Sequence, residues 1–241
     1  MKLFHWNGPV PYRVAFSTRL GGVSEGPYES LNLGILTDDE PERVVANRRR
    51  LTEAVGADPE TTTMAWQVHG AEVTEACPRG VVTPGTVYER CDGLWTDRQG
   101  QGMMLLTADC FPVALCRANG EPALAVLHVG WKGLLSGIAD AGLAAIRNGG
   151  AVAAAIGPGI GPCCYEVGDE VAAPFRERFG DDVLYGRNLD LAEATGRALR
   201  AAGCETVWRS EHCTACEADL FFSHRRDRGV TGRQGVIASI D

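Results

Sequence analysis

Residues 102–115 read GMMLLTADCFPVAL, and this stretch decides how the fold is interpreted. Apolar residues at both ends are typical of a buried strand, but the run TADC at 107–110 interrupts them. Pro112 follows, and proline cannot donate to a sheet ladder. We therefore expect a core strand over 103–106, then a break that turns Cys110 towards a site, with Pro112 limiting regular pairing just after the thiol.

The overall composition is that of a folded, acidic globule. The chain has 241 residues, 45% of them hydrophobic and 22% charged, so it can bury a core without disulfide staples. Its formal net charge of −8 argues against a surface that binds nucleic acid or an anionic membrane. We expect neither partner, although a local basic pocket is compatible with this charge.

The cysteines and the N-terminal sequence bear on the cellular compartment. Nine cysteines are an odd number scattered along the chain, which fits reduced cytosolic thiols better than a disulfide framework. The N-terminal residues lack the apolar core of a signal peptide, and no later apolar run approaches membrane-spanning length. We therefore expect a cytoplasmic protein.

Helical and strand-forming segments alternate along the chain. Three segments have apolar residues at helical spacing and end at glycine: 39–56, 134–150 and 189–203. Strand-forming runs lie between them, and 61–76 reads as paired strands around a turn at Gly70. Residues 1–241 are therefore predicted to form a single α/β domain with a mixed β-sheet and flanking helices.

Three residues that could bind a metal stand at predicted strand ends: His69 in QVHG, Cys110 in TADC and His128 in LHVGWKG. Strand ends of one sheet can converge in space although they are far apart in sequence. Two imidazoles and a thiolate suit zinc, with a fourth position open for water. Spacing alone leaves a structural interpretation open, in which each histidine is a polar strand cap and the cysteine a small buried residue.

The same residues also allow a metal-free alternative. His69 or His128 could activate Cys110 as a nucleophile, with Asp109 as the candidate orienting group. The second histidine favours the metal, because a thiol nucleophile needs only one base.

Two further cysteine motifs are interpreted as structural. HCTAC at 212–216 has C-x-x-C spacing, but a structural zinc site needs four ligands and the chain has no second C-x-x-C. Cys163 and Cys164 are adjacent, so their side chains point apart on most backbones. We expect one of them to pack in the interior.

Basic residues suggest where an anionic co-substrate could bind. The candidates are Arg19 in STRLGG, Arg48 in NRRR and Lys132 in GWKG. The prolines of GPGIGP at 157–162 lack the N–H groups that a phosphate loop needs. We interpret that stretch as a rigid turn that shapes a pocket wall.

Several motifs in fixed order carry a resemblance to a known family. They are TRLGGVSEGPYESLNLG, QVHG, DGLWTD, TADCFPVAL, HVGWKG, GPGIGPCCYEVG and FFSHRRDRGVTGR, and they span nearly the whole chain. Together they resemble the YfiH-type family, once called laccase-domain or multicopper polyphenol oxidases and now regarded as purine nucleoside phosphorylases.

The resemblance implies a YfiH-like α/β domain, related in architecture to bacterial deamidating toxins, with zinc held by His69, Cys110 and His128. It implies phosphorolysis of adenosine, inosine and 5′-methylthioadenosine by inorganic phosphate, together with adenosine deaminase activity. From its position next to Cys110, and not from the resemblance, we expect Asp109 to serve as an acid or to orient a histidine. Lys132 stands where the family commonly has arginine, and lysine lacks the planar fork for a bidentate anion contact.

The older oxidase label does not fit the composition. A blue-copper site and a trinuclear cluster are built almost entirely from histidine, and this chain has five histidines. We therefore reject a laccase mechanism, although copper could occupy the site in vitro because of its higher intrinsic affinity. Two alternatives stay open: a metal-free cysteine hydrolase or amidase, for which peptidoglycan editing would be a setting, and a non-catalytic metal-binding protein.

Overall fold

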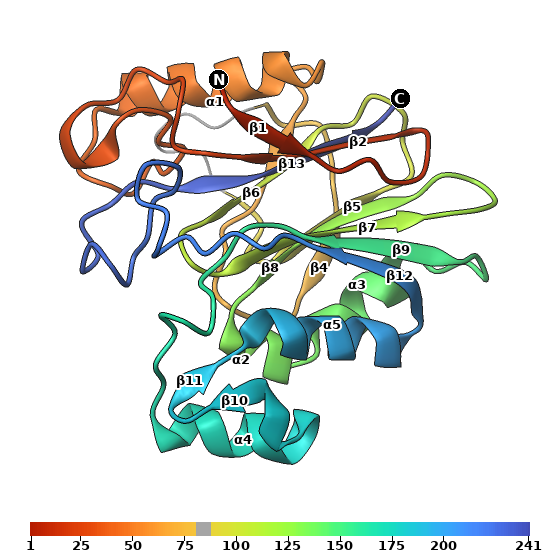
Figure 1. Cartoon of the computed structure of the whole chain (residues 1–241). Coiled ribbons are helices and arrows are strands. Elements are labelled where there is room, and N and C mark those ends of the chain that lie inside the picture. Colours follow the sequence, from red (N-terminus) through yellow and green to blue (C-terminus); the bar gives the residue numbers. More distant parts are fainter. Residues whose placement is uncertain (81–87) are drawn as a thin grey trace.

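Two mixed β-sheets pack face to face in this chain, and helices cover their outer sides (Figure 1). The computed structural model describes residues 1–80 and 88–241. The first sheet has the strand order β1-β2-β13-β6-β3, and the second has the order β12-β9-β7-β8-β5-β4. The α/β class with mixed pairing is confirmed, but two large sheets and a separate two-stranded sheet take the place of a single one.

The first sheet is formed by β1 (Leu3–His5), β2 (Tyr12–Ser17), β3 (Thr63–Met64), β6 (Met103–Thr107) and β13 (Gln234–Ile240). The second is formed by β4 (Val73–Glu75), β5 (Gly93–Thr96), β7 (Phe111–Arg117), β8 (Leu124–Val129), β9 (Val152–Ile156) and β12 (Cys204–Arg209). Apolar side chains from both sheets meet between them and form one buried layer, which includes Phe16, Leu105, Val126 and Val236.

The helices form the two outer layers. On the first sheet lies α1 (Pro41–Ala54), and on the second lie α2 (Trp131–Leu135), α3 (Ile138–Ile146) and α5 (Leu191–Ala202). The remaining helix, α4 (Asp169–Phe179), packs against α2 and α5 on their side away from the sheet. The remaining short elements are η1 (Gly26–Tyr28), η2 (Asp181–Val183), β10 (Leu184–Tyr185) and β11 (Asn188–Leu189). Among the described residues, no helix combines the length and apolarity that a membrane crossing requires.

The expected helices are largely found. The segments 39–56 and 189–203 become α1 and α5, and α5 begins where the Asp190 carboxylate accepts a hydrogen bond from the Glu193 N–H. The third segment is divided into α2 and α3, because Gly137 adopts a left-handed φ of 92° between them.

The opening stretch GMMLLTADCFPVAL holds two strands that belong to different sheets. β6 lies in the first sheet and β7 in the second, so the chain crosses between the sheets within residues 108–110. Our expectation for Pro112 is wrong. It is the second residue of β7, in register with His128, and its carbonyl accepts a hydrogen bond from Gly157 N at 2.8 Å. The missing N–H of Pro112 leaves the pairing intact, because the residues of β7 that follow it pair regularly with both neighbouring strands.

The expected pairing within 61–76 is also wrong. β3 pairs with β6 in the first sheet, whereas β4 pairs with β5 in the second. The residues between β3 and β4 therefore form another crossing between the sheets, and His69 lies in it. The sequence pattern identified strand-forming residues, but it carried no information about which strand each would pair with.

Gly157 offers a test of how closely the two sheets approach. It follows β9 in the second sheet, and a Cβ there would overlap the ring of Phe16 from the first. We expect Gly157→Ala to lower the free energy of unfolding by roughly 1–3 kcal/mol, because overpacking forces the sheets apart. Denaturant unfolding of both proteins measures this change, and an unaltered midpoint would contradict the close approach.

Candidate functional site

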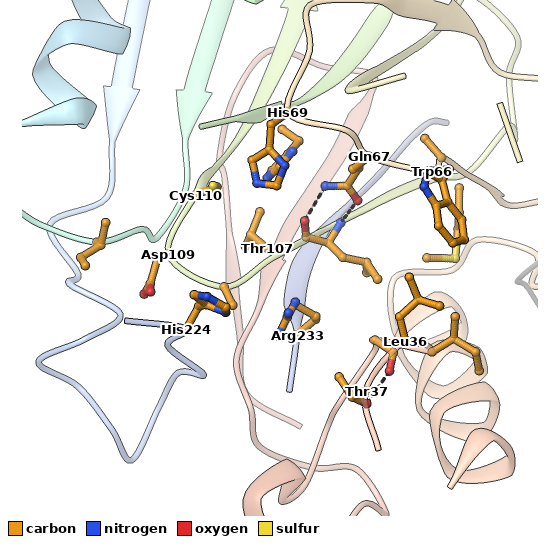
Figure 2. Close-up of a pocket in the computed structure, with 18 of the residues that line it drawn as sticks. Leu36, Thr37, Trp66, Gln67, His69, Thr107, Asp109, Cys110, His224 and Arg233 are labelled. Carbon is orange, nitrogen blue, oxygen red and sulfur yellow. Dashed lines mark hydrogen bonds between the residues drawn. The ribbon is translucent and has the colours of Figure 1, made fainter. Parts of the chain in front are cut away.

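A cavity of about 510 Å³ lies at the point where the crossings between the sheets meet. His69, Cys110 and His128 line it, from the crossing after β3, the crossing after β6 and the end of β8. Figure 2 shows His69 above Cys110 and Thr107, with Asp109, His224 and Arg233 on the opposite side. The site is therefore built mainly from connections between the sheets, with the sheets as its rigid support.

The structure brings the three predicted ligands together. One ligand atom from each of His69, Cys110 and His128 lies within 4.8 Å of the others. The two imidazole rings have centroids 4.8 Å apart and an interplanar angle of 70°. His128 is buried, Cys110 is half-buried and His69 is exposed, so the group is reachable from solvent on one side. Two nitrogens and one sulfur at this spacing could hold a zinc ion.

Asp92, to which the sequence analysis gave no role, orients two of these ligands. Its carboxylate is fully buried, and it lies 2.8 Å from His128 Nδ1, which leaves the Nε2 of that ring for Cys110 or a metal. It also accepts hydrogen bonds from the backbone N–H groups of Val68, His69 and Gly70 at 3.1, 2.8 and 2.7 Å. Asp92 is the first residue of the quoted motif DGLWTD, and its position immediately before a strand was the only available signal.

The backbone at two site residues adopts a conformation that side chains rarely take. His69 has φ of 60° and Asp109 has φ of 86°. Residues with a positive φ turn the chain sharply. Their unfavourable backbone energy is tolerated where surrounding contacts hold them in place, commonly at functional sites. Gly130 adds a steric requirement, because a Cβ there would lie 3.1 Å from Cys110 Sγ and 3.2 Å from His69 Cδ2.

The charges of Cys110 and His128 are coupled. Burial by itself would raise the pKa of the Cys110 thiol, but His128 and His69 outweigh burial and lower that pKa to about 6. Burial also disfavours a charged imidazole, yet Cys110 and Asp92 raise the pKa of His128 to about 9. At neutral pH without metal, the pair is therefore a thiolate beside an imidazolium.

Asp109 lines the cavity, but both of its carboxylate oxygens have hydrogen-bond partners within the protein. Thr214 Oγ1 donates to Oδ1 at 2.7 Å, and the backbone N–H of Arg225 donates to Oδ2 at 2.7 Å. Its backbone carbonyl accepts from Ile160 N at 2.9 Å. From the sequence, Asp109 is the candidate for the group that orients the histidine of a Cys–His pair. In the structure Asp92 has that position, because its carboxylate contacts His128.

The three predicted anion contacts are separated in the structure. Arg48 lines the cavity and is almost fully buried, with its Nε donating to the Leu33 carbonyl. Arg19 donates to the Glu29 and Ala218 carbonyls and packs over Phe222, outside the cavity lining. Lys132 lies over the Trp131 ring and is likewise absent from the lining.

Arg233 is a cavity cation that the sequence analysis missed. Its guanidinium donates to the carbonyls of Thr231 and Gly232, and within residues 1–80 and 88–241 no ion pair joins it to a carboxylate. Burial lowers its pKa, an effect that the charges of Asp109 and Cys110 oppose. A partly desolvated cation without an ion pair favours an anionic ligand. The motif FFSHRRDRGVTGR contains Arg233, but it contains three other arginines that its pattern does not distinguish.

A buried hydroxyl also faces the cavity without a partner. Thr107 is 2% exposed, and its Oγ1 has no hydrogen-bond partner in the described part of the chain. Gln67 lies beside it with its amide fixed to the Leu106 backbone by two hydrogen bonds, which Figure 2 draws as dashed lines. Ile160 places the GPGIGP turn on the cavity wall, as the sequence predicted. The cavity thus offers a free donor, a cation and a soft ligand set.

Known proteins resemble this chain over almost its full length. The family model described as multi-copper polyphenol oxidoreductase laccase matches residues 13–241. Purine nucleoside phosphorylase YlmD of Geobacillus stearothermophilus is 39% identical, over 94% of this chain and 90% of the relative. A purine nucleoside phosphorylase of Deinococcus radiodurans is 40% identical, over 97% and 90% respectively. The crystal structure of the Bacillus licheniformis hypothetical protein YfiH has a TM-score of 0.87 at 33% identity, covering 95% of this chain and 93% of that one.

Substitution of Asp92 tests whether its carboxylate orients the ligands. We expect Asp92→Asn to weaken zinc binding by roughly 10- to 100-fold, because an amide cannot accept from His128 and three N–H groups together. Competition with a chromogenic chelator measures the affinity. Asp97→Asn, at an exposed position five residues on, is the matched control. Equal affinities of the Asp92 variant and its parent would show that the carboxylate does not orient the ligands.

The pKa of Cys110 gives a second prediction, for protein stripped of metal. The thiolate is the reactive form, so alkylation of Cys110 by iodoacetamide should rise with pH and reach half its maximum near pH 6. Peptide mass spectrometry follows this cysteine among the nine. In His128→Ala the midpoint should move up towards ~8.5, the value of a free cysteine. A wild-type midpoint above pH 8 would exclude the thiolate–imidazolium pair.

Proposed function

The chain belongs to the multi-copper polyphenol oxidoreductase laccase family, and from that premise we propose that it is a zinc-dependent purine nucleoside phosphorylase. Its substrates would be adenosine, inosine and 5′-methylthioadenosine with inorganic phosphate, and it would also deaminate adenosine. The observation that carries this proposal is the meeting of His69, Cys110 and His128 in a cavity that also contains Arg233.

The donor set fits zinc. Two imidazoles and one thiolate, with one coordination position left for substrate or water, are typical of catalytic zinc sites. His69, Cys110 and His128 would hold the ion, and Asp92 would keep the His128 ring in place. When bound, zinc supplies a Lewis acid and lowers the pKa of coordinated water.

The cavity residues can divide the work of phosphorolysis. In this reaction a phosphate oxygen bonds to C1′ of the ribose while the bond from C1′ to the purine nitrogen breaks. Arg233 would hold the phosphate through charge-assisted hydrogen bonds, and the Thr107 hydroxyl would donate to phosphate or ribose. Burial raises the pKa of Tyr165 to about 12, so its phenol stays protonated and can donate to the ligand.

We propose a positioning role for Asp109. Its two oxygens already accept hydrogen bonds from Thr214 and Arg225, so a proton on either oxygen would disrupt one of them. The carboxylate instead fixes the turn that presents Cys110. Deamination needs no phosphate, since water replaces the amino group at C6 of the purine. It would therefore depend on the metal ligands and not on Arg233.

A laccase reaction is not supported by the residues present. A multicopper oxidase needs a histidine-rich trinuclear cluster in addition to a blue-copper site. Of the five histidines, His69, His128 and His224 line the cavity, whereas His212 lies 2.9 Å from Glu217 at another surface. One metal at a His/Cys/His site is what this arrangement provides.

A metal-free cysteine hydrolase is a second candidate, and one observation favours it. Cys110, His128 and Asp92 have the order nucleophile, base and orienting carboxylate, and the pKa of Cys110 is low. Zinc content separates the two proposals. Activity that persists below about 0.1 zinc per chain would favour the hydrolase, because a catalytic metal must be present to act.

The deciding experiment is incubation with adenosine, with and without phosphate, followed by chromatography of the products. Adenine and ribose 1-phosphate should form only with phosphate, and inosine in both cases. Cys110→Ser and His69→Ala should abolish both reactions. Arg233→Met should lower phosphorolysis by about 10²-fold, on the scale of a lost charge-stabilising donor, and spare deamination. Arg98→Met, an exposed arginine paired with Glu75, is the matched control.

Three outcomes would contradict parts of this proposal. Ribose 1-phosphate formation that survives loss of both His69 and Cys110 would exclude the metal site as the catalytic centre. Equal losses of phosphorolysis and deamination in Arg233→Met would exclude a specific phosphate role. Zinc binding without turnover of any purine nucleoside would identify a non-catalytic metal-binding protein.

A further inference from the structure

Four cysteines that the catalytic proposal does not use gather at one place on the surface. They are Cys163, Cys164, Cys213 and Cys216, and their sulfur atoms all lie within 4.8 Å of one another. Cys216 Sγ is 3.4 Å from the sulfurs of both Cys163 and Cys164. None of the four lines the cavity of the candidate active site.

The topology explains why two distant motifs meet. β9 and β12 are parallel neighbours in the second sheet, so the loops that follow them leave from the same edge. The GPGIGPCC loop follows β9 and the HCTAC loop follows β12. Gly159 and Cys213 form a bridge between these loops, in which Thr214 N donates to the Gly159 carbonyl at 3.0 Å. The thiols are thus brought together by backbone pairing that does not involve them.

This arrangement corrects the expectation that Cys163 and Cys164 point apart, with one of them in the interior. They lie in a turn, where the alternation of a strand does not apply, and both sulfurs reach Cys216. Cys163 is exposed and Cys164 half-buried. The adjacent pair therefore supplies the two ligands that a second C-x-x-C would have supplied.

The spacing suits a tetrahedral metal site. Zinc–sulfur bonds of about 2.3 Å place the sulfurs of a tetrahedral site about 3.8 Å apart, within the range seen here. A disulfide requires about 2.05 Å, and all four cysteines are free. Gly161 N donates to Cys213 Sγ at 3.2 Å, a contact that stabilises a thiolate. Exposure of Cys163 and Cys216 gives the ion a path of entry.

We propose that Cys163, Cys164, Cys213 and Cys216 form a second zinc site, a closed tetrathiolate centre that is structural and separate from the His69/Cys110/His128 site. Soft thiolates in a four-sulfur set select zinc among the common divalent ions, and a site with no open position binds the metal without catalysing a reaction. The four cysteines are hereafter called the cysteine quartet.

The cysteine quartet would act on the active site by holding the loops that fix Asp109. The HCTAC loop supplies Thr214, whose hydroxyl donates to the Asp109 carboxylate, and the GPGIGP loop supplies Ile160, whose N–H donates to the Asp109 carbonyl. Asp109 has a left-handed φ and precedes Cys110. A zinc ion joining the two loops would therefore restrain the turn that carries a catalytic ligand from a place outside the cavity.

Metal analysis of variant proteins tests this proposal independently of activity. Wild-type protein should contain two zinc ions per chain, and Cys163→Ser/Cys216→Ser should contain one. These two positions are exposed, so the serines do not disturb the core. Cys77→Ser, which removes an exposed cysteine outside both sites, is the matched control and should keep two.

X-ray absorption at the zinc edge tests the cysteine quartet separately from the proposed catalytic zinc site. In His69→Ala/His128→Ala the cysteine quartet is intact, and the remaining zinc should show a shell of four sulfurs at about 2.3 Å. A sulfur-only shell supports the quartet even if the wild type holds a single zinc. A shell containing nitrogen, absence of zinc from this variant, or a disulfide within the quartet of the native protein would overturn the proposal.

Chelation provides a second measurement on the wild-type chain. Removal of zinc should expose the 157–164 and 210–217 loops to protease, and cleavage should be mapped there before it occurs elsewhere. The Cys163→Ser/Cys216→Ser variant should be cut in the same loops without chelator. Loops that are equally resistant with and without zinc would contradict a clamping role.

Discussion

The passage of the chain from one sheet to the other within residues 108–110 is the constraint on which this structure depends. β6 and β7 belong to sheets that bury their apolar faces against each other, so the connection between them must turn sharply at the edge of that interface. The left-handed φ of Asp109 makes the turn, and the next residue, Cys110, is delivered to the cavity. A thiol inside an apolar run is thereby placed at a site without breaking the core.

Several connections between the sheets converge on the same place, and each contributes a functional group. The crossing after β3 carries His69, the crossing after β6 carries Cys110, and the long connection from β12 to β13 carries Arg233. Buried Asp92 joins the first of these to His128 at the end of β8. These side chains are held in place by backbone hydrogen bonds and sheet packing, and such preorganisation favours metal binding and catalysis.

Sulfur has two different settings in this molecule. Cys110 stands with two imidazoles at a cavity, where the histidines lower its pKa and leave room for a substrate. The cysteine quartet stands on the surface with sulfur as its only ligand type, over two loops that also anchor Asp109. The proposed catalytic zinc site has mixed ligands and an open position, whereas the proposed structural zinc site has sulfur ligands alone and no open position. Neither set supplies the histidine-rich trinuclear cluster that a multicopper oxidase requires.

The sequence by itself identified His69, Cys110 and His128 as a possible ligand set and located the ends of α1 and α5 to within two residues. The helix signals are local, because apolar periodicity and a terminal glycine act within a few residues of each other. The tertiary structure alone decided that most strands form two large sheets, that Asp92 orients His128, and that Arg233 lines the cavity. It also decided that Cys163 and Cys164 meet Cys213 and Cys216. These outcomes depend on contacts between segments that are far apart in the chain. The free energy that stabilises such contacts comes from burying the apolar faces of both sheets together, so a local sequence pattern does not predict them.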